Sequence, residues 1–398
     1  MAPAFMPDDL LLQIFLRLPP QPSCLLRASL VCKRWRGLIT DPGFLRQRRA
    51  PVLGVFLNTP PYRACFVPAG DPPDRVPGTL FRCPEASWIV RDSRRGRVLL
   101  CGQGRFLVWD PATDAQRLVP RPPVGDGGRF LYGFGAVLLR DDDVASSGGF
   151  RVAVAFVEAG AAVGAVYASD TGAWATAQGA AVTGSIPWTA KSGTAVGDSV
   201  YWLLDDDRVL SLEVRAGGSP RVLVVLEPRN SPSVHARNVK LMRTPDGGEL
   251  GLGLAAVTGS ALRLWALEAN GHGGAVSWML RRTLRLDALL RIPGSSRRRG
   301  GTDRFGEIRS LAAALVPSDD DDGGQRDDDS DSTSTPCARI VGVDEEGAMV
   351  FLNRMDGIFM LALEATPRIK KICDSYYMLH QRFDTVCSFA SLFGLGNI

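Results

Sequence analysis

The sequence has 398 residues, of which 46 are Lys or Arg, 42 are Asp or Glu, and 45% are apolar. This is an ordinary globular composition, with enough apolar side chains for one large core or several small ones. The net charge of +4 is too small to favour a chain that binds nucleic acid along its whole length.

The few histidines and scattered cysteines argue against metal and disulfide sites. His235, His272 and His380 lie far apart, so no His-based metal centre is expected. Asp8 and Asp9 lie where a secretory signal has its cationic region, so we expect reduced thiols in a reducing compartment, cytoplasmic and/or nuclear. No Cys-x-x-Cys pair of the zinc-ribbon kind occurs, because the eight cysteines stand at positions 24, 32, 65, 83, 101, 337, 373 and 387.

The first fifty residues carry the positive charge and helical periodicity. Eight Lys and Arg against three Asp make this segment +5, which leaves the rest of the chain close to neutral. Three short helices are predicted: one capped by Asp8 or Asp9, one over 23–30 capped by Ser23, and one over 32–39 ended by Asp41-Pro42. So short a module cannot bury all its apolar side chains internally, so part of its surface needs a partner.

Three segments of this module resemble the F-box family. They are MPDDLL at 6–11, IFLRLP at 14–19 and LRASLVCKRWRGLI at 26–39, and the resemblance covers residues 5–48. Met6 and Gln13 depart from the common pattern, in which Leu and Glu are usual. In that family a three-helix module docks on the Skp adaptor of a cullin-based ubiquitin ligase.

The resemblance also implies which residues contact the adaptor. Carried over by position, the residues that lie in or under the docking face are Pro7, Leu10, Leu11, Ile14, Leu18, Leu30, Val31, Cys32, Trp35 and Leu38. The periodicity alone leaves another interpretation open, in which the helices are a cap packed on the following domain.

After residue 50 the pattern is that of many short antiparallel strands. Runs rich in Val, Leu and aromatic residues alternate with Gly, Asp, Asn and Pro, and no long amphipathic helix separates them, so an all-β domain is predicted over 51–375. The clearest runs are 52–57, 98–101, 106–109, 150–157, 200–204, 222–226, 262–267, 348–352 and 358–363.

A hairpin repeats along this domain, starting near residues 108, 166, 210, 262 and 360. Propeller blades of the kelch or WD class recur about every 40 to 50 residues, so we predict a kelch-like β-propeller of about six blades, the first drawn from 52–100. Asp110 and Asp170 are interpreted as turn residues, and Trp109 and Trp174 as fillers between blades. The domain, with its Val-Tyr-Trp-Leu-Leu phrase at 200–204, resembles the propeller-like domain that follows the F-box in large plant families.

Two segments of the domain do not follow the strand pattern. Residues 318–336 hold eight Asp among Ser, Gly and Thr, which predicts a disordered acidic insert, and Arg297–Arg299 just upstream are interpreted as a solvated loop. Residues 376–398 form either a C-terminal tail or the strand that closes the ring. If they form a tail, a strand near 368–373 closes the ring.

No motif nominates a catalytic or cofactor site. The Gly251-Leu252-Gly253 run mimics a dinucleotide fingerprint but lies in an apolar run that reads as a strand. The apolar stretch 152–168 includes Glu158 and is interpreted as two strands around a turn, so no membrane span is expected. No nucleophile with a matching base is found, so no catalytic residue and no cofactor are expected.

The favoured hypothesis is therefore a non-catalytic substrate receptor of a Skp–cullin–F-box ubiquitin ligase, with an unknown target protein bound by the β-domain. The alternative is a stand-alone propeller binding module or enzyme with a helical cap. Nucleic-acid binding ranks third, because the near-neutral β-domain lacks a basic stripe with interleaved aromatic residues.

Overall fold

The structure is a computed structural model, and part of the chain is described. The described residues are 6–19, 21–48, 50–59, 63–84, 87–102, 104–123, 134–140, 149–158, 160–187, 193–214, 220–226, 228–230, 238–244, 250–269, 276–290, 338–374 and 386–391. The predicted acidic insert at 318–336 and the Arg297–Arg299 loop lie outside them.

Four helices open the chain: α1 (Asp8–Arg17), α2 (Pro22–Ser29), α3 (Lys33–Thr40) and α4 (Pro42–Gln47). The three predicted helices are α1 to α3, but two predicted caps are wrong. Pro7 is the N-cap of α1, and Gln21 is the N-cap of α2. In α2 the first helical residue is Pro22, which suits this position because proline has no backbone N–H that would need a partner. Asp41 begins α4 instead of only ending α3, since its carboxylate accepts a hydrogen bond from Phe44 N at 3.0 Å.

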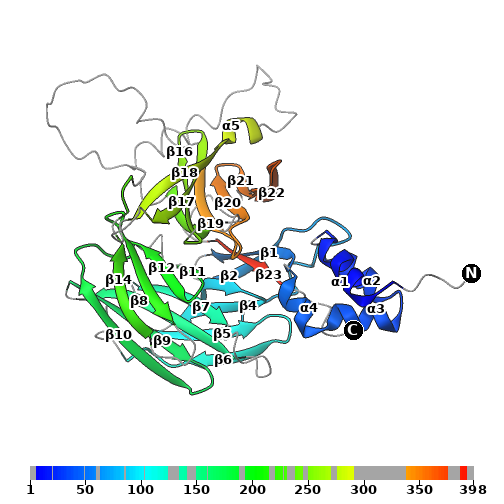
Figure 1. Ribbon diagram of the computed structural model, residues 1–398, viewed down its shortest axis with the longest axis horizontal. Coiled ribbons are helices and arrows are strands. Elements are labelled where there is room, and N and C mark those ends of the chain that lie inside the picture. Colours follow the sequence, from blue (N-terminus) through cyan, green and yellow to red (C-terminus); the bar gives the residue numbers. More distant parts are fainter. Residues whose placement is uncertain are drawn as a thin grey trace, which may run out of the picture.

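The described strands form six antiparallel sheets, which we number as blades (Figure 1). Blade 1 contains β1 (Val52–Thr59), β2 (Arg63–Pro68) and β23 (Val386–Ala390), and blade 2 contains β3 (Ile89–Arg94), β4 (Arg97–Gly102), β5 (Arg105–Asp110) and β6 (Ala115–Val119). Blade 3 contains β7 (Phe134–Arg140), β8 (Phe150–Glu158), β9 (Ala161–Ala168) and β10 (Ala173–Ala181), and blade 4 contains β11 (Thr194–Val196), β12 (Ser199–Leu203), β13 (Val209–Val214) and β14 (Pro220–Leu226). Blade 5 contains β15 (Val239–Arg243), β16 (Leu252–Thr258), β17 (Ala261–Ala269) and β18 (Val276–Arg285), and blade 6 contains β19 (Arg339–Val343), β20 (Met349–Arg354), β21 (Gly357–Ala362) and β22 (Arg368–Asp374), with a short helix α5 (Leu286–Leu289) between these two blades.

The six sheets close into a ring. One edge strand of each blade faces the centre, and these inner strands contact one another in the cyclic order β23, β3, β7, β11, β15, β19 and back to β23. The fold is therefore a six-bladed β-propeller that follows a helical N-terminal module, as predicted (Figure 1).

The last described strand completes the first blade. β23 pairs antiparallel with β1, so Leu57 stands opposite Val386 and Phe56 opposite Cys387. On its other side, blade 6 approaches so closely that a Cβ at Gly342 would lie 2.2 Å from the Val386 carbonyl oxygen. Of the two options for closure, the structure has a strand within 376–398, while β22 lies at the outer edge of blade 6.

Side chains from both faces of each blade fill the space between neighbours. In β4, Val98 and Leu100 point into the core shared with blade 1, whereas Leu99 and Cys101 point into the core shared with blade 3. Successive side chains on a strand face opposite ways, so a strand buried on both faces needs apolar residues at every position. This explains the continuous apolar runs in the sequence.

The repeated hairpin is the outer pair of strands in each of blades 2 to 6. Its turns have the predicted chemistry, since the Asp110 carboxylate accepts a hydrogen bond from Ala112 N at 3.0 Å. Trp109 is 1% exposed and packs between blades 1 and 2, which confirms the filler interpretation. The apolar stretch 152–168 lies in the β8–β9 hairpin, as predicted. Among the described helices, none has the length and apolar character that crossing a membrane requires.

The closing strand should carry much of the stability of the ring. Phe389 is fully buried, with its ring centroid 5.0 Å from that of Phe81 and 5.4 Å from that of Phe56. We expect Phe389→Ala to lower the free energy of unfolding by about 3–5 kcal/mol, measured by chemical denaturation. Leu118→Ala, at a side chain that is 51% exposed, is the control and should change it by less than about 0.5 kcal/mol. Equal effects of the two substitutions would contradict this account of closure.

Candidate functional site

The helical module has a small core of its own. Phe15 lies at its centre, with its ring 5.1 Å from Trp35 and 6.3 Å from Phe44 in edge-to-face arrangements. The other buried members of this core are Leu11, Leu25, Ala28 and Ile39. This core contains no propeller residue, so the module is held together by its own side chains.

A buried arginine fixes the end of α1. Arg48 is 7% exposed, and its guanidinium donates to the carbonyl oxygens of Phe15 at 2.5 Å, Leu18 at 3.1 Å and Pro19 at 2.8 Å. The last carbonyls of a helix lack partners within the helix and carry partial negative charge, so a cation there satisfies both requirements. Arg48, at the end of α4, thereby fixes the start of the propeller domain against α1.

A second arginine joins the beginnings of α1 and α3. Arg34 Nε donates to the Asp8 carboxylate at 2.8 Å, and Arg34 Nη2 donates to the Met6 carbonyl oxygen at 2.5 Å. Cys32 caps α3, because its Sγ accepts from Trp35 N at 3.5 Å. Val31 and Cys32, directly before α3, are thus brought to the same end of the module as Met6.

This module presents most of the exposed apolar surface of the described chain. Eleven large apolar side chains are exposed among the described residues, and six of them fall between residues 6 and 31. We call these six the exposed apolar face: Met6 at 42% exposure, Leu10 at 55%, Ile14 at 44%, Leu26 at 41%, Leu30 at 71% and Val31 at 62%. Exposed apolar side chains concentrated in this way are characteristic of interaction surfaces.

The ten predicted adaptor-binding residues divide by burial. Pro7, Leu10, Ile14, Leu30, Val31 and Cys32 are exposed. Leu18, Trp35 and Leu38 are half-buried against the module core, and Leu11 is 3% exposed within it. These last four support the exposed face from beneath. Met6 and Leu26 are exposed but were not among the predicted residues. Helical spacing could have identified Leu26, because it follows the buried Leu25 and consecutive residues of a helix point in different directions.

The comparisons with known proteins agree with this description of the module. Residues 4–50 match the family described as F-box-like. The N-terminal module is an F-box-like domain. No curated protein matches the chain.

Several solved structures are similar to the chain at low identity. Hsv2 of Kluyveromyces lactis is 14% identical with a TM-score of 0.33, over 60% of this chain and 75% of that one. AofleA of Arthrobotrys oligospora is 11% identical with a TM-score of 0.36, over 72% and 73%. YCF48 bound to the D1 peptide is 10% identical with a TM-score of 0.34, over 81% and 82%. Similarity at this level bears on neither function nor ligand.

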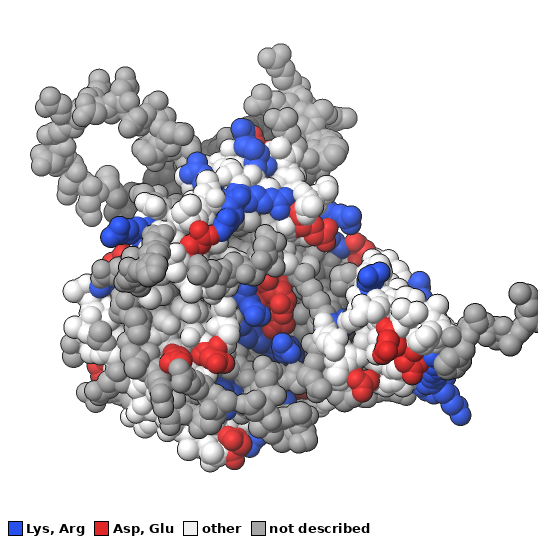
Figure 2. All heavy atoms as spheres, in the orientation of Figure 1, with Lys and Arg blue, Asp and Glu red and all other residues white. Residues whose placement is uncertain are grey.

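The centre of the propeller holds a second candidate site. A hollow there is lined by inner strands β3, β11, β15, β19 and β23 and by residues that flank them. Figure 2 shows acidic and basic side chains gathered in this central hollow. Asp92, Thr194, Lys240 and Asp344 line it and are each less than 9% exposed, so charged and polar groups are largely buried there.

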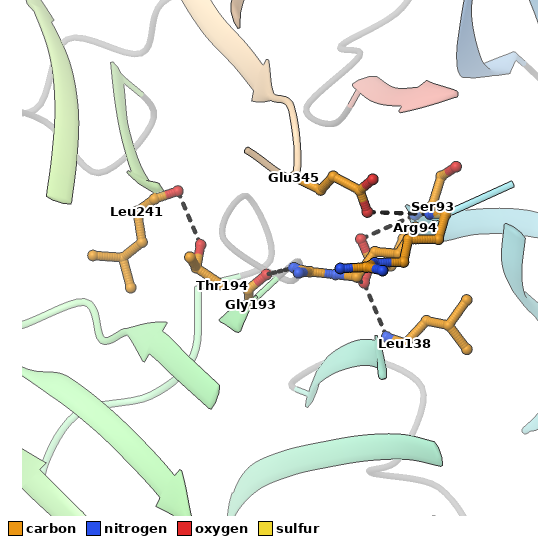
Figure 3. Close-up of polar contacts among 9 residues, drawn as sticks. Ser93, Arg94, Leu138, Gly193, Thr194, Leu241 and Glu345 are labelled. Atoms are coloured by element: carbon orange, nitrogen blue, oxygen red, sulfur yellow. Dashed lines mark hydrogen bonds and ion pairs between the residues drawn. The ribbon is translucent and has the colours of Figure 1, made fainter. Parts of the chain in front are cut away.

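Hydrogen bonds across this hollow join several blades (Figure 3). The Asp92 carboxylate of blade 2 accepts from Arg94 Nε at 2.9 Å and from Leu138 N of blade 3 at 2.9 Å. Arg94 Nη2 reaches across to donate to the Gly193 carbonyl oxygen beside blade 4 at 3.2 Å. From blade 6, the Glu345 carboxylate accepts from Arg95 N at 3.1 Å. We call this group the channel network.

The electrostatics of the channel network favour its ionised form at Arg94. Burial by itself lowers the pKa of the Arg94 guanidinium, but the charge and hydrogen bond of Asp92, with the charge of Glu345, raise it above its usual value. Burial raises the pKa of the Glu345 carboxyl, and the charge of Arg94 opposes that rise. The network is thus a set of matched charges that satisfy one another.

The channel network fits a structural role better than a chemical one. Its strongest donors and acceptors are directed at each other, and the described residues contain no group of three His, Cys, Asp or Glu able to hold a metal ion. The network therefore links blades at the centre of the ring.

Breaking the channel network should destabilise the propeller. Asp92→Ala removes the acceptor of Arg94 Nε and of Leu138 N, and removing one partner of a buried pair costs about 3–5 kcal/mol of unfolding free energy. The matched control is Glu364→Ala, which removes a carboxylate 4.0 Å from Arg368 where both side chains are more than 60% exposed. We expect less than about 1 kcal/mol there. Chemical denaturation measures the unfolding free energy of both variants. An equal loss of unfolding free energy in the two would refute the stabilising role of the network.

Proposed function

We propose that this protein is the substrate-recognition subunit of a Skp–cullin–F-box ubiquitin ligase. The F-box-like domain binds a Skp-type adaptor, and through it a cullin, while the propeller binds a target protein. The observation that carries the proposal is the exposed apolar face on the F-box-like domain. It provides the apolar anchors that a protein interface needs at its centre.

In this proposal the protein acts without a catalytic residue. A receptor that holds a target close to a ubiquitin-loaded enzyme raises the effective concentration of the target's lysines, and no chemistry is required of the receptor itself. A propeller suits this task, because a rigid ring carries loops from every blade on its two faces. In this proposal the complex transfers ubiquitin to the target in the cytoplasm or the nucleus.

The module and the propeller are joined in a way that suits two separate binding tasks. Ser23 N, in the first turn of α2, donates to the Asp74 carboxylate of blade 1 at 2.7 Å, and Arg48 fixes α1 at the point where the chain enters β1. These polar contacts orient the module beside the ring (Figure 1). They leave the exposed apolar face available to a partner.

The exposed apolar face is tested by placing a carboxylate in it. Ile14→Asp and Val31→Asp should each weaken binding of a purified Skp-type adaptor by roughly 30-fold or more, because a buried charge replaces an apolar anchor worth about 2 kcal/mol. The readout is the dissociation constant from calorimetry, with thermal unfolding as a check on folding. Met355→Asp, at a side chain 77% exposed on the propeller, is the control and should bind like the unaltered protein. Wild-type affinity in both module variants would refute the docking proposal.

A truncation separates this proposal from the alternative of a propeller with a helical cap. Because the module core contains no propeller residue, a chain of residues 51–398 should unfold thermally within a few degrees of the full protein, and it should lose adaptor binding. A cap would behave differently, since its removal exposes apolar propeller surface and lowers the unfolding temperature strongly. Differential scanning calorimetry of the two chains measures the difference. Loss of the folded propeller on truncation would favour the cap.

The target protein is identified by purifying it together with this protein. Affinity purification of the full chain from cells with the proteasome or neddylation blocked should enrich the target, because it is then bound but not degraded.

A further inference from the structure

The ring has a seam where its two ends meet. β2 is the outermost described strand of blade 1 and β22 the outermost strand of blade 6, and the two contact each other. Lys370 Nζ, on β22, lies 2.6 Å from the Asp71 carboxylate, which follows β2. A shared apolar core lies beneath, and we call it the seam core: Val55, Leu57, Ala69, Val341, Phe351, Ile358, Ile372 and Val386.

Two cysteines face this seam from opposite sides. Cys65 stands opposite Leu57 in the β1–β2 pairing, and Leu57 belongs to the seam core. Its neighbour Phe66 packs instead into the core shared with blade 2, so the alternation of side chains along β2 turns Cys65 toward blade 6. Cys373, on β22, packs against the seam core from blade 6. The fold therefore brings together two thiols that lie 308 positions apart in the sequence.

The two thiols differ in their exposure to solvent. Neither cysteine is in a disulfide; Cys65 is exposed and Cys373 is half-buried. Burial raises the pKa of the Cys373 thiol, and the nearby Asp374 and Cys65 act in the same direction. Because it is the more exposed thiol, Cys65 meets a dissolved oxidant first. Cys373 lies on the facing strand and is placed to resolve the oxidised sulfur, at a rate that its raised pKa limits, because the thiolate is the attacking form.

We propose that Cys65 and Cys373 form a reversible disulfide across the seam of the propeller. Hydrogen peroxide, or another peroxide, oxidises the Cys65 thiolate to a sulfenic acid. The Cys373 thiolate then attacks that sulfur, the S–S bond forms, and hydroxide leaves and is protonated to water. Overall the two thiols lose two electrons and two protons, and one hydrogen peroxide is reduced to two waters, or one organic peroxide to an alcohol and one water. A low-molecular-weight thiol restores both cysteines by exchange.

The crosslink changes what holds the ring closed. In the reduced protein, blade 6 and blade 1 are joined by the packing of the seam core, by the Lys370–Asp71 pair and by contacts of the inner strands. A disulfide adds a covalent bond at the outer edge and closes a loop that contains most of the propeller, which restricts the unfolded chain. Oxidation therefore opposes opening of the seam, so the rigidity of the target-binding domain depends on thiol oxidation.

Peptide mapping tests the bond directly on the full chain. The purified protein is treated with hydrogen peroxide, alkylated, and digested with trypsin without reductant. Cleavage gives one fragment of residues 64–75 and one of 372–382, each with a single cysteine. We expect these two fragments to appear linked, at their summed mass less two hydrogens, and to separate after reduction. A fully oxidised sample without this linked pair would overturn the proposal.

Thermal unfolding provides the second readout. Oxidation should raise the unfolding temperature of the protein by several degrees, and both Cys65→Ser and Cys373→Ser should abolish that rise. Cys24→Ser removes a half-buried thiol of the helical module and is the matched control, which should retain the rise. A rise that persists in Cys65→Ser, an exposed and mild substitution, would overturn the proposal. Adaptor binding by the reduced protein is unaffected by either result, so this test is independent of the proposed function.

Discussion

The burial of both faces of every blade is the constraint on which this structure depends. A sheet covered on both faces by apolar side chains has no stable existence alone, so each blade needs a neighbour on either side, and only a closed ring gives one to all six. Six apolar cores between blades result, and the loss of any one exposes two sheets. Each blade is therefore stable only when the whole ring is closed.

Closure explains the features at the centre and at the edge of the ring. The chain enters the propeller at β1 and returns as β23 to complete the same blade, so one sheet joins the two ends of the domain. The channel network ties several blades at the axis, where Arg94 and Asp92 satisfy each other away from water. At the outer edge the seam relies on packing and one ion pair, and this is where two cysteines lie.

The F-box-like domain obeys the opposite rule. It is too small to bury all its apolar side chains, and its core keeps Phe15 and Leu11 while Leu10, Ile14 and Val31 stay in contact with solvent. Arg48 and Arg34 hold the helices in place with hydrogen bonds instead of further apolar packing. The two parts of the protein thus differ: the propeller buries most of its large apolar side chains between blades, whereas the small module leaves six of its own exposed.

Much of this organisation was readable from local pattern. The spacing of Leu10, Ile14 and Leu18 indicates a helix, and the alternation of apolar runs with Asp and Gly turns indicates hairpins, because both periods come from backbone geometry within a few residues. The hairpin repeat predicted about six blades, since blades 2 to 6 each supply one outer hairpin. The first blade predicted over 52–100 was wrong, because β3 and β4 belong to blade 2 and blade 1 is completed by β23 from the other end of the domain. The caps predicted at Asp8 or Asp9 and at Ser23 were wrong, because these residues lie inside the first turns of α1 and α2, which begin after Pro7 and Gln21.

The sequence by itself determined the helical module, the all-β class and the propeller repeat, which all rest on contacts close along the chain. Only the tertiary structure decided which strand closes the ring, that Leu11 is buried while Leu30 is exposed, and that the strands carrying Cys65 and Cys373 lie side by side. Those outcomes depend on pairs of residues far apart in sequence. Their proximity is set by the closure of the whole ring and the packing of the module, and no short stretch of the chain records it.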